Sequence, residues 1–236
     1  MKKILFSAAA ILAGSLLAAY ADPKDDVTGA AQKLITGANY SWQTTVVVPA
    51  GSRFKPGPTD GKIQGNMTDV KMSFGDNHTQ FIIDGTNAVI TDPDDGSWEK
   101  LSDVDTQGMG RFLVGMVQNF KGSASQAADL AADAQSLQQS GNSITGSLTA
   151  DGAKKLMTFG RGRRGGGNGP SISNPSGTVT FWVDGGQLTK FEFHVKGTMA
   201  GRDGNDIPVD RDTTVKISDV GTTKIDVPAD AKKLLP

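Results

Sequence analysis

The chain has 236 residues, a formal net charge of −1 and no cysteine. The lack of cysteine excludes disulfide bonds, a thiolate nucleophile, a cysteine-based zinc site and acylation at a lipobox cysteine. The near-neutral charge gives no overall attraction to nucleic acid or to anionic lipid. Glycine accounts for 30 residues, nearly twice its usual share of ~7%, and mostly marks turns, which indicates many short strands.

The N-terminus has the three parts of a bacterial secretory signal peptide. Two lysines precede an apolar run over residues 4–17, and the sequence AYA that ends at Ala21 matches the A-x-A cleavage pattern. The apolar run is shorter than the roughly 20 residues that span a bilayer, which disfavours an uncleaved anchor helix. We therefore expect a signal peptide over residues 1–21 and a mature chain of residues 22–236 with a formal charge of −3. No later segment is long and apolar enough to cross a membrane, so we expect a periplasmic or secreted protein without a transmembrane segment.

The first part of the mature chain predicts one helix followed by antiparallel strands. Residues 25–35 have the spacing of an amphipathic helix, which Gly37 ends. The stretch YSWQTTVVV (40–48) predicts a strand, and the proline- and glycine-rich stretch 49–61 predicts a loop. Over residues 62–101, apolar and polar residues alternate between Gly, Asn and Asp turns, which indicates a meander of hairpins.

A helical segment around residues 107–159 interrupts these strands. Apolar residues recur at helical spacing over 109–120, and a second helix over 126–139 follows a serine cap. A short strand over 143–148 leads to a third helix, which begins after Thr149.

The last part of the chain predicts a return to the sheet. Residues 177–197 alternate on both sides of a DGG turn, which is typical of a hairpin. Two further strands are predicted over 213–220 and 222–228, and a short helix over 229–235. With no internal repeat visible, we expect residues 22–236 to form one domain of the α+β class.

The stretch GRGRRG (160–165) contains a literal G-x-G-x-x-G. A dinucleotide-binding fingerprint needs a strand before the glycines and a helix after them, whereas here a predicted helix precedes them and a Gly/Pro-rich stretch follows. An RGG-type tract fits poorly with an acidic, exported chain, so no nucleic-acid partner is expected. We interpret the stretch as a helix stop and a solvated connector, in which Arg161, Arg163 and Arg164 either have no specific role or contact an anionic head group.

Signals for catalysis or for a metal are weak. The histidines, His78 and His194, have no partner at metal-ligand spacing, and the G-x-S-x-G, H-E-x-x-H and Walker motifs are absent. The acidic stretches 92–99 and 203–212 are better explained as solvated turns than as calcium loops. We predict no metal, no cofactor and no enzymatic activity, with an exported hydrolase that uses an unrecognised carboxylate site as an alternative.

The most informative signal is a consistently apolar face on the predicted strands, which a second layer must cover. The helical stripe at 109–120 and the Ala/Leu-rich helix after it are the natural cover. The two layers either form a filled core, or the sheet curls around the helices and leaves an apolar cavity for a lipid tail. Candidate lining residues on the sheet side are Trp42, Val46, Val70, Met72, Phe74, Phe81, Phe181, Phe191 and Phe193. The candidates on the helical side are Phe112, Met116 and Phe120.

The order of these elements resembles that of the LolA/LolB/LppX-like lipoprotein-carrier superfamily. The strand GSWEKL (96–101), the helical segment in mid-chain and the ending TTVKISDVGTTKIDVPADAKKLL (213–235) carry the resemblance. It implies a curved antiparallel sheet, an incomplete barrel wrapped over a few helices, and a cavity for lipid or acyl chains. The expected function is a non-enzymatic carrier or chaperone that binds a lipid, an acyl chain or another apolar ligand in this cavity. Its expected partner is a lipid or an acylated protein, and no oligomeric state is predicted. An envelope structural or interaction module with a filled core is the alternative.

Overall fold

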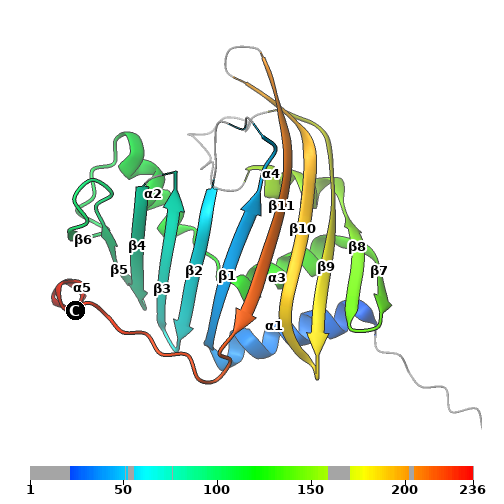
Figure 1. Ribbon diagram of the computed structural model, residues 1–236, viewed down its shortest axis with the longest axis horizontal. Helices are drawn as coiled ribbons and strands as arrows, with labels where there is room; N and C mark the ends of the chain where they lie inside the picture. Colours follow the sequence, from blue (N-terminus) through cyan, green and yellow to red (C-terminus); the bar gives the residue numbers. More distant parts are fainter. Residues whose placement is uncertain are drawn as a thin grey trace, which may run out of the picture.

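The computed structural model describes residues 22–50, 52, 56–75, 77–158, 171–201 and 205–235, with the exception of the side chain of Phe74. These residues form an α+β fold in which a curved antiparallel sheet covers helices without closing into a barrel (Figure 1). The order of the eleven strands is β6-β5-β4-β3-β2-β1-β11-β10-β9-β8-β7. The predicted fold class is therefore confirmed.

The elements have the following bounds. The strands are β1 (Asn39–Val47), β2 (Pro56–Gln64), β3 (Met67–Phe74), β4 (Asn77–Asp84), β5 (Asn87–Thr91), β6 (Trp98–Lys100), β7 (Ala134–Ser140), β8 (Ser143–Leu148), β9 (Ile172–Asp184), β10 (Gln187–Ala200) and β11 (Asp206–Ser218). The helices are α1 (Pro23–Gly37), α2 (Gly108–Gln118), α3 (Ser123–Asp133), α4 (Ala150–Thr158) and α5 (Ala229–Leu234).

The first and the last strand are neighbours in the middle of the open sheet. β1 pairs antiparallel with β11, with Trp42 opposite Ile217, and this pairing joins the meander β1–β6 to the strands β7–β11. Since both halves then share one sheet, their apolar faces form one continuous surface on the side of the helices. We call this side the inner face and the opposite side the outer face.

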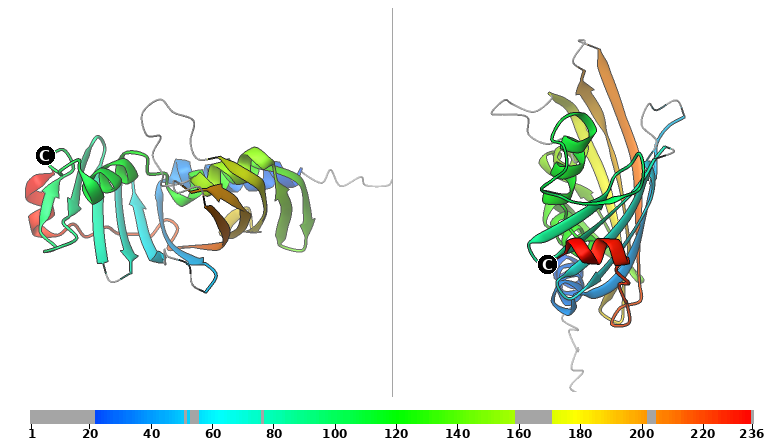
Figure 2. Two further views of the ribbon diagram at one scale, coloured as in Figure 1. Left: turned by 90° about the horizontal axis from the view of Figure 1, so that it is seen from above. Right: turned by 90° about the vertical axis from the view of Figure 1, so that its left-hand side faces the viewer.

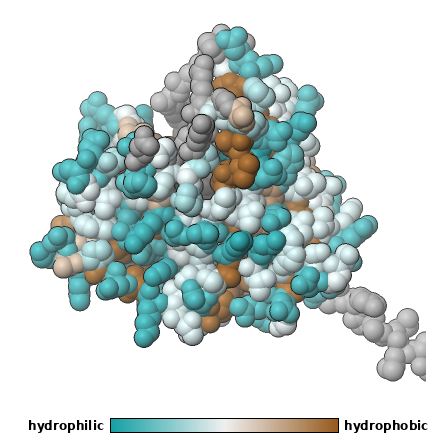
Figure 3. Space-filling model, viewed as in Figure 1, coloured by the Kyte–Doolittle hydropathy of each residue, from teal (hydrophilic) through white to brown (hydrophobic). Residues whose placement is uncertain are grey.

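Helices cover the inner face in two groups. α1, α3 and α4 lie together behind the half formed by β7–β11, and α2 lies behind the half formed by β1–β6 (Figures 1 and 2). The main core lies between these helices and the inner face. The outer face is mostly hydrophilic, with few apolar patches (Figure 3). One exception is a small second core, where Ala231 of α5 packs against Ile82 and Val89.

The second helix of the middle segment is shorter than predicted. α3 ends at Asp133, and the residues that follow form the edge strand β7 rather than a helix up to residue 139. β7 pairs with β8 through a bulge, at which Ser136 has a positive φ of 51°. Gly146 on β8 makes room for this bulge, because a Cβ there would lie 2.7 Å from the carbonyl oxygen of Gln135. Strand pairing thus overrides the helical propensity of the Ala/Gln-rich sequence.

Two predictions about strands were also wrong. The stretch 49–61 is only partly a loop, because β2 begins at Pro56. β1 pairs with β2 only from Thr59 onward, so the two prolines at the start of β2 lie where β1 does not need their missing N–H groups. Residues 222–228, predicted as a strand, form no strand and run to α5, held in part by Gln64, whose Oε1 accepts a hydrogen bond from the backbone N–H of Ile225.

Candidate functional site

The structure brings most of the predicted lining residues together on the inner face. Phe112, Met116 and Phe120 are half-buried and pack against the main core, whereas Val46 is half-buried and lies outside it. The side chain of Phe74 is outside the described part. The predicted residues that are buried in this core are Trp42, Val70, Met72, Phe81, Phe181, Phe191 and Phe193.

Aromatic rings form a cluster where the chain leaves α2. Phe120 lies between Trp42, at a centroid distance of 6.0 Å, and Phe81, at 5.3 Å in an edge-on arrangement. Tyr40 extends the cluster, with its ring centroid 5.8 Å from that of Trp42. We call Tyr40, Trp42, Phe81 and Phe120 the aromatic cluster. Here α2 and the residues directly after it cover the inner face of the sheet.

Helix α2 is apolar on more than one side. Leu113 and Val117 are buried against the sheet, while Met116 and other apolar side chains are half-buried and Met109 is 59% exposed. Its one charged residue, Arg111, is exposed and makes no ion pair among the described residues. Arg111 and Gln118 form the polar side of this helix, so Met109 is a large apolar side chain that the described part of the chain leaves uncovered.

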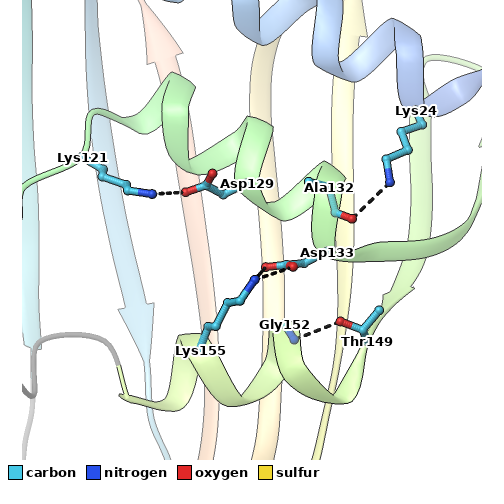
Figure 4. Close-up of polar contacts among 8 residues, drawn as sticks. All are labelled: Lys24, Lys121, Asp129, Ala132, Asp133, Thr149, Gly152 and Lys155. Carbon is cyan, nitrogen blue, oxygen red and sulfur yellow. Dashed lines mark hydrogen bonds and ion pairs between the residues drawn. The ribbon is translucent and has the colours of Figure 1, made fainter. Parts of the chain in front are cut away.

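The other inner-face helices are joined by polar contacts (Figure 4). Lys155 of α4 binds both carboxylate oxygens of Asp133 at the end of α3, at 2.8 and 3.0 Å, and this contact raises the pKa of Lys155. Lys24 of α1 donates to the carbonyl oxygen of Ala132 at 3.1 Å. Thr149 caps α4, as predicted, by accepting from the N–H of Gly152 at 2.9 Å. These contacts make α1, α3 and α4 one connected unit, whereas α2 relies on apolar packing.

One charged side chain also lies on the inner face. Arg211 of β11 donates from Nη2 to the carbonyl oxygen of Leu156 at 2.7 Å, while its buried Nε has no hydrogen-bond partner. Burial lowers the pKa of Arg211. Residues 203–212 were predicted as a solvated loop, so this residue was missed, because β11 begins at Asp206 and includes most of that stretch. The alternation of Val209, Arg211 and Thr213 with outward-facing acids is the signal that predicts it.

Two hollows lie on the surface of the described chain, and neither contains a predicted lining residue. The first, of about 310 Å³, lies between α1 and the β8–β9 region and is lined partly by Asp25, Asp26 and Lys33. The second, of about 520 Å³, lies beside α4 and is lined by polar and charged side chains such as Asp151 and Lys154. Charged residues line both hollows, which does not suit an acyl chain, so the apolar inner face is the better candidate.

Among the described residues, few side chains could act as the nucleophile, acid or base of a hydrolase. Ser73 Oγ lies 2.8 Å from Nδ1 of His78, but His78 is exposed and has no carboxylate within 4.0 Å among the described residues. His194 pairs with Asp210 at 2.7 Å on the outer face. Burial, followed by nearby acids, raises the pKa of Glu99. These groups lie apart from one another on different strands, so they do not assemble a site.

The acidic stretch 92–99 uses its carboxylates within its own turn. Asp92 Oδ1 accepts from the backbone N–H of Asp94 at 2.7 Å, and Asp95 Oδ1 accepts from that of Ser97 at 2.8 Å. Within the described ranges, no group of three or more His, Cys, Asp or Glu residues is arranged to hold a metal ion.

Several predictions fall on residues outside the described part: the cleavage site at Ala21 and the basic connector with Arg161, Arg163 and Arg164. They stay predictions. None of the helices described above combines the length and the apolar character that crossing a bilayer requires.

The comparison with solved structures finds several similar chains. The chain is similar to the crystal structure of Mycobacterium tuberculosis lipoprotein LppX, with 12% sequence identity and a TM-score of 0.45. The match covers 86% of this chain and 98% of that chain. No family model and no curated protein matches the sequence.

Proposed function

We propose that this protein is an exported, non-enzymatic carrier or chaperone that binds the acyl chain of a lipid or of an acylated protein. The chain would lie between the inner face of the sheet and α2. The observation that carries the proposal is the character of α2, which is apolar on several sides, partly exposed and without an ion pair among the described residues. Apolar contacts with an acyl chain can replace those that such a helix makes with the sheet, which offsets the cost of moving it.

The aromatic cluster supplies the surface that the ligand would use. Phe120 separates Trp42 from Phe81, so an outward movement of α2 uncovers the faces of both rings. Gly108, with a φ of 52°, and Gly122 bracket the helix and are suited to act as its hinges. Each methylene that the ligand buries contributes about 0.8 kcal/mol, so a chain of about ten methylenes offsets a displacement cost of several kcal/mol.

The lack of cysteine allows a direct test with a single label. Met116→Cys carries an environment-sensitive fluorophore on α2, and Lys216→Cys carries the same fluorophore on the outer face as the control. We expect hexadecanoyl ligands to change the emission at position 116 in a saturable way and to leave position 216 unchanged. We also expect native mass spectrometry of the protein, purified from a bacterial host, to show bound lipid. If neither signal is seen, the carrier function is wrong.

A filled-core interaction module is the second candidate. It is favoured by the close packing of the aromatic cluster and by the complete burial of Phe181 and Phe191, whose ring centroids are 6.3 Å apart. The two candidates differ in one measurable respect. A filled core predicts that the label on α2 does not respond to any acyl ligand, even at saturating concentration.

A further inference from the structure

The side chains of β11 that point to the inner face, here called its inner row, include the charged residue Arg211. Along this row, Val209, Arg211, Thr213, Val215 and Ile217 follow one another, and the last three are buried. β11 is a central strand between β1 and β10, and Arg211 lies directly opposite the fully buried Val195. The guanidinium therefore belongs to the same face as the proposed acyl site and not to the hydrophilic outer face.

The known contacts of Arg211 leave its charge uncompensated. Its bond to Leu156 at 2.7 Å satisfies a carbonyl group in the last turn of α4, where a cation is favourable. However, Nε is buried without a partner, and among the described residues no carboxylate lies within 4.0 Å of the guanidinium. Arg211 as a whole is half-buried, and a charge that is partly removed from water without a counter-ion still carries a cost that a carbonyl oxygen offsets only in part. An anion that reaches Arg211 would therefore gain both charge compensation and an unused donor.

We propose that Arg211 binds the anionic head group, a carboxylate or a phosphate, of the amphiphile that this protein carries. This inference rests on the proposed function and narrows its ligand from acyl chains in general to anionic amphiphiles. Thr213, a buried hydroxyl two residues along the same row, is placed to donate a second hydrogen bond to the head group. The planar guanidinium is suited to either anion, since it donates two parallel hydrogen bonds.

Between Arg211 and the aromatic cluster, the inner face has apolar side chains together with the threonines Thr213, Thr44 and Thr59. On β1, Val46 pairs with Thr213 and is half-buried outside the main core, and Met72 lies on the inner face of β3 beyond it. β11 and β3 are three strand spacings apart, about 14 Å, and Met72 is level with Val215, four residues or about 13 Å along the sheet from Arg211, so the two sites are about 20 Å apart. An extended acyl chain spans this distance, which places its head group at Arg211 and its tail beneath α2.

The test compares ligands of one chain length. Hexadecanoate, its methyl ester and 1-hexadecanoyl lysophosphatidic acid each compete with the neutral dye Nile red for the full chain. We expect the wild type to prefer the two anions over the ester by about 10-fold or more. Arg211→Met should remove this preference and leave the affinity for the ester unchanged. Arg211→Lys should keep part of it, and Lys216→Met, on the outer face of the same strand, should keep all of it.

The outcomes separate this inference from the function on which it rests. Binding of both acid and ester with equal affinity to the wild type would overturn the role of Arg211 and leave the carrier function intact. Arg211→Met that weakens acid and ester alike would also overturn it, because Arg211 would then only hold α4 in place. No displacement of the dye by any ligand would contradict the carrier function itself. The preference between phosphate and carboxylate identifies the class of head group. If Arg211→Met does not fold, equal affinity of the wild type for acid and ester still overturns the inference, and Arg211→Lys still tests the residue.

Discussion

The indole ring of Trp42 on β1 occupies the space beside Gly61, its directly opposed partner on β2. A Cβ atom at Gly61 would lie 2.0 Å from Cζ2 of Trp42. Because glycine leaves this space open, the indole lies close to the backbone of β2 and its ring remains available to Phe120. The aromatic cluster thus depends on the absence of one side chain.

Gly61→Ala should therefore destabilise the fold by about 2 kcal/mol, since the indole must move out of a closely packed position. The matched control is Gly29→Ala on the exposed side of α1, where a Cβ meets no atom within 4 Å. That control should stabilise the protein by about 0.5–1 kcal/mol through helix propensity. Urea unfolding followed by tryptophan fluorescence measures both. Equal stabilities of the two variants would show that Trp42 can be accommodated elsewhere.

The parts of the fold that were predictable are those in which one physical preference dominates. The hairpin of β9 and β10 was predicted because its apolar residues alternate strictly around a glycine turn, and the structure pairs Phe181 with Phe191 across it. Helix α2 was predicted from the helical spacing of its apolar residues, and the start of α4 was predicted from the capping residue Thr149. In each of these, local sequence and tertiary packing favour the same structure.

The parts that were not predictable depend on neighbours distant in sequence. The local sequence of β7 predicts a helix. The residues form a strand because they pair with β8, where Gly146 leaves room for the bulge of β7. Arg211 was overlooked because the many aspartates around it suggest a solvated loop, whereas pairing with β10 and β1 places it on the inner face. Composition alone cannot distinguish a polar loop from a strand whose outer row is acidic.

Tyr40 provides a second test of packing at the aromatic cluster. Its buried hydroxyl accepts from the backbone N–H of Ala124 at 3.3 Å, near the start of α3. Tyr40→Phe leaves that donor unpaired, so we expect a loss of about 1–2 kcal/mol in the free energy of unfolding. Hydrogen exchange at Ala124 should become faster in the variant. Unchanged exchange and stability would mean that water replaces the hydroxyl at no cost.

Burial also raises the pKa of Tyr40, which makes its ionisation a probe of unfolding. The chain has two tyrosines, and Tyr20 lies in the predicted signal peptide, so Tyr40 is the single phenol of the expected mature chain of residues 22–236. The unfolded state loses the phenolic proton near pH 10.0, before the folded state does, so this contribution to stability is complete below pH 10 and is lost at higher pH. Absorbance at 295 nm should therefore rise together with the loss of tertiary structure. A rise near pH 10 in the folded protein would contradict this.

The contact between Lys155 and Asp133 predicts a second dependence on pH. Hydrogen bonding to Asp133, and then its charge, raises the pKa of Lys155 above its ordinary value of 10.5. The contact therefore stabilises the protein below that pH and ceases to do so as the pH rises through the raised pKa. We expect Lys155→Met to lower the melting temperature slightly at pH 7 and to match the wild type once the pH exceeds the raised pKa of Lys155. Lys154→Met, at an exposed neighbouring position, should show no such difference at either pH.

The C-terminal helix α5 protects the outer face of the sheet edge. Ala231 is fully buried against Ile82 and Val89, which point to the outer face because they alternate with inner-face residues such as Phe81. Ala231→Glu places a charge in this contact, so we expect α5 to separate from the sheet and the stability to fall by about 3 kcal/mol as both side chains become exposed. Ala229→Glu is the matched control, because it puts the same carboxylate at an exposed position in the first turn of α5, where it interacts favourably with the helix dipole. Limited proteolysis should release the C-terminus of the first variant and spare that of the second. Equal protection in both would show that α5 contributes little to the sheet edge.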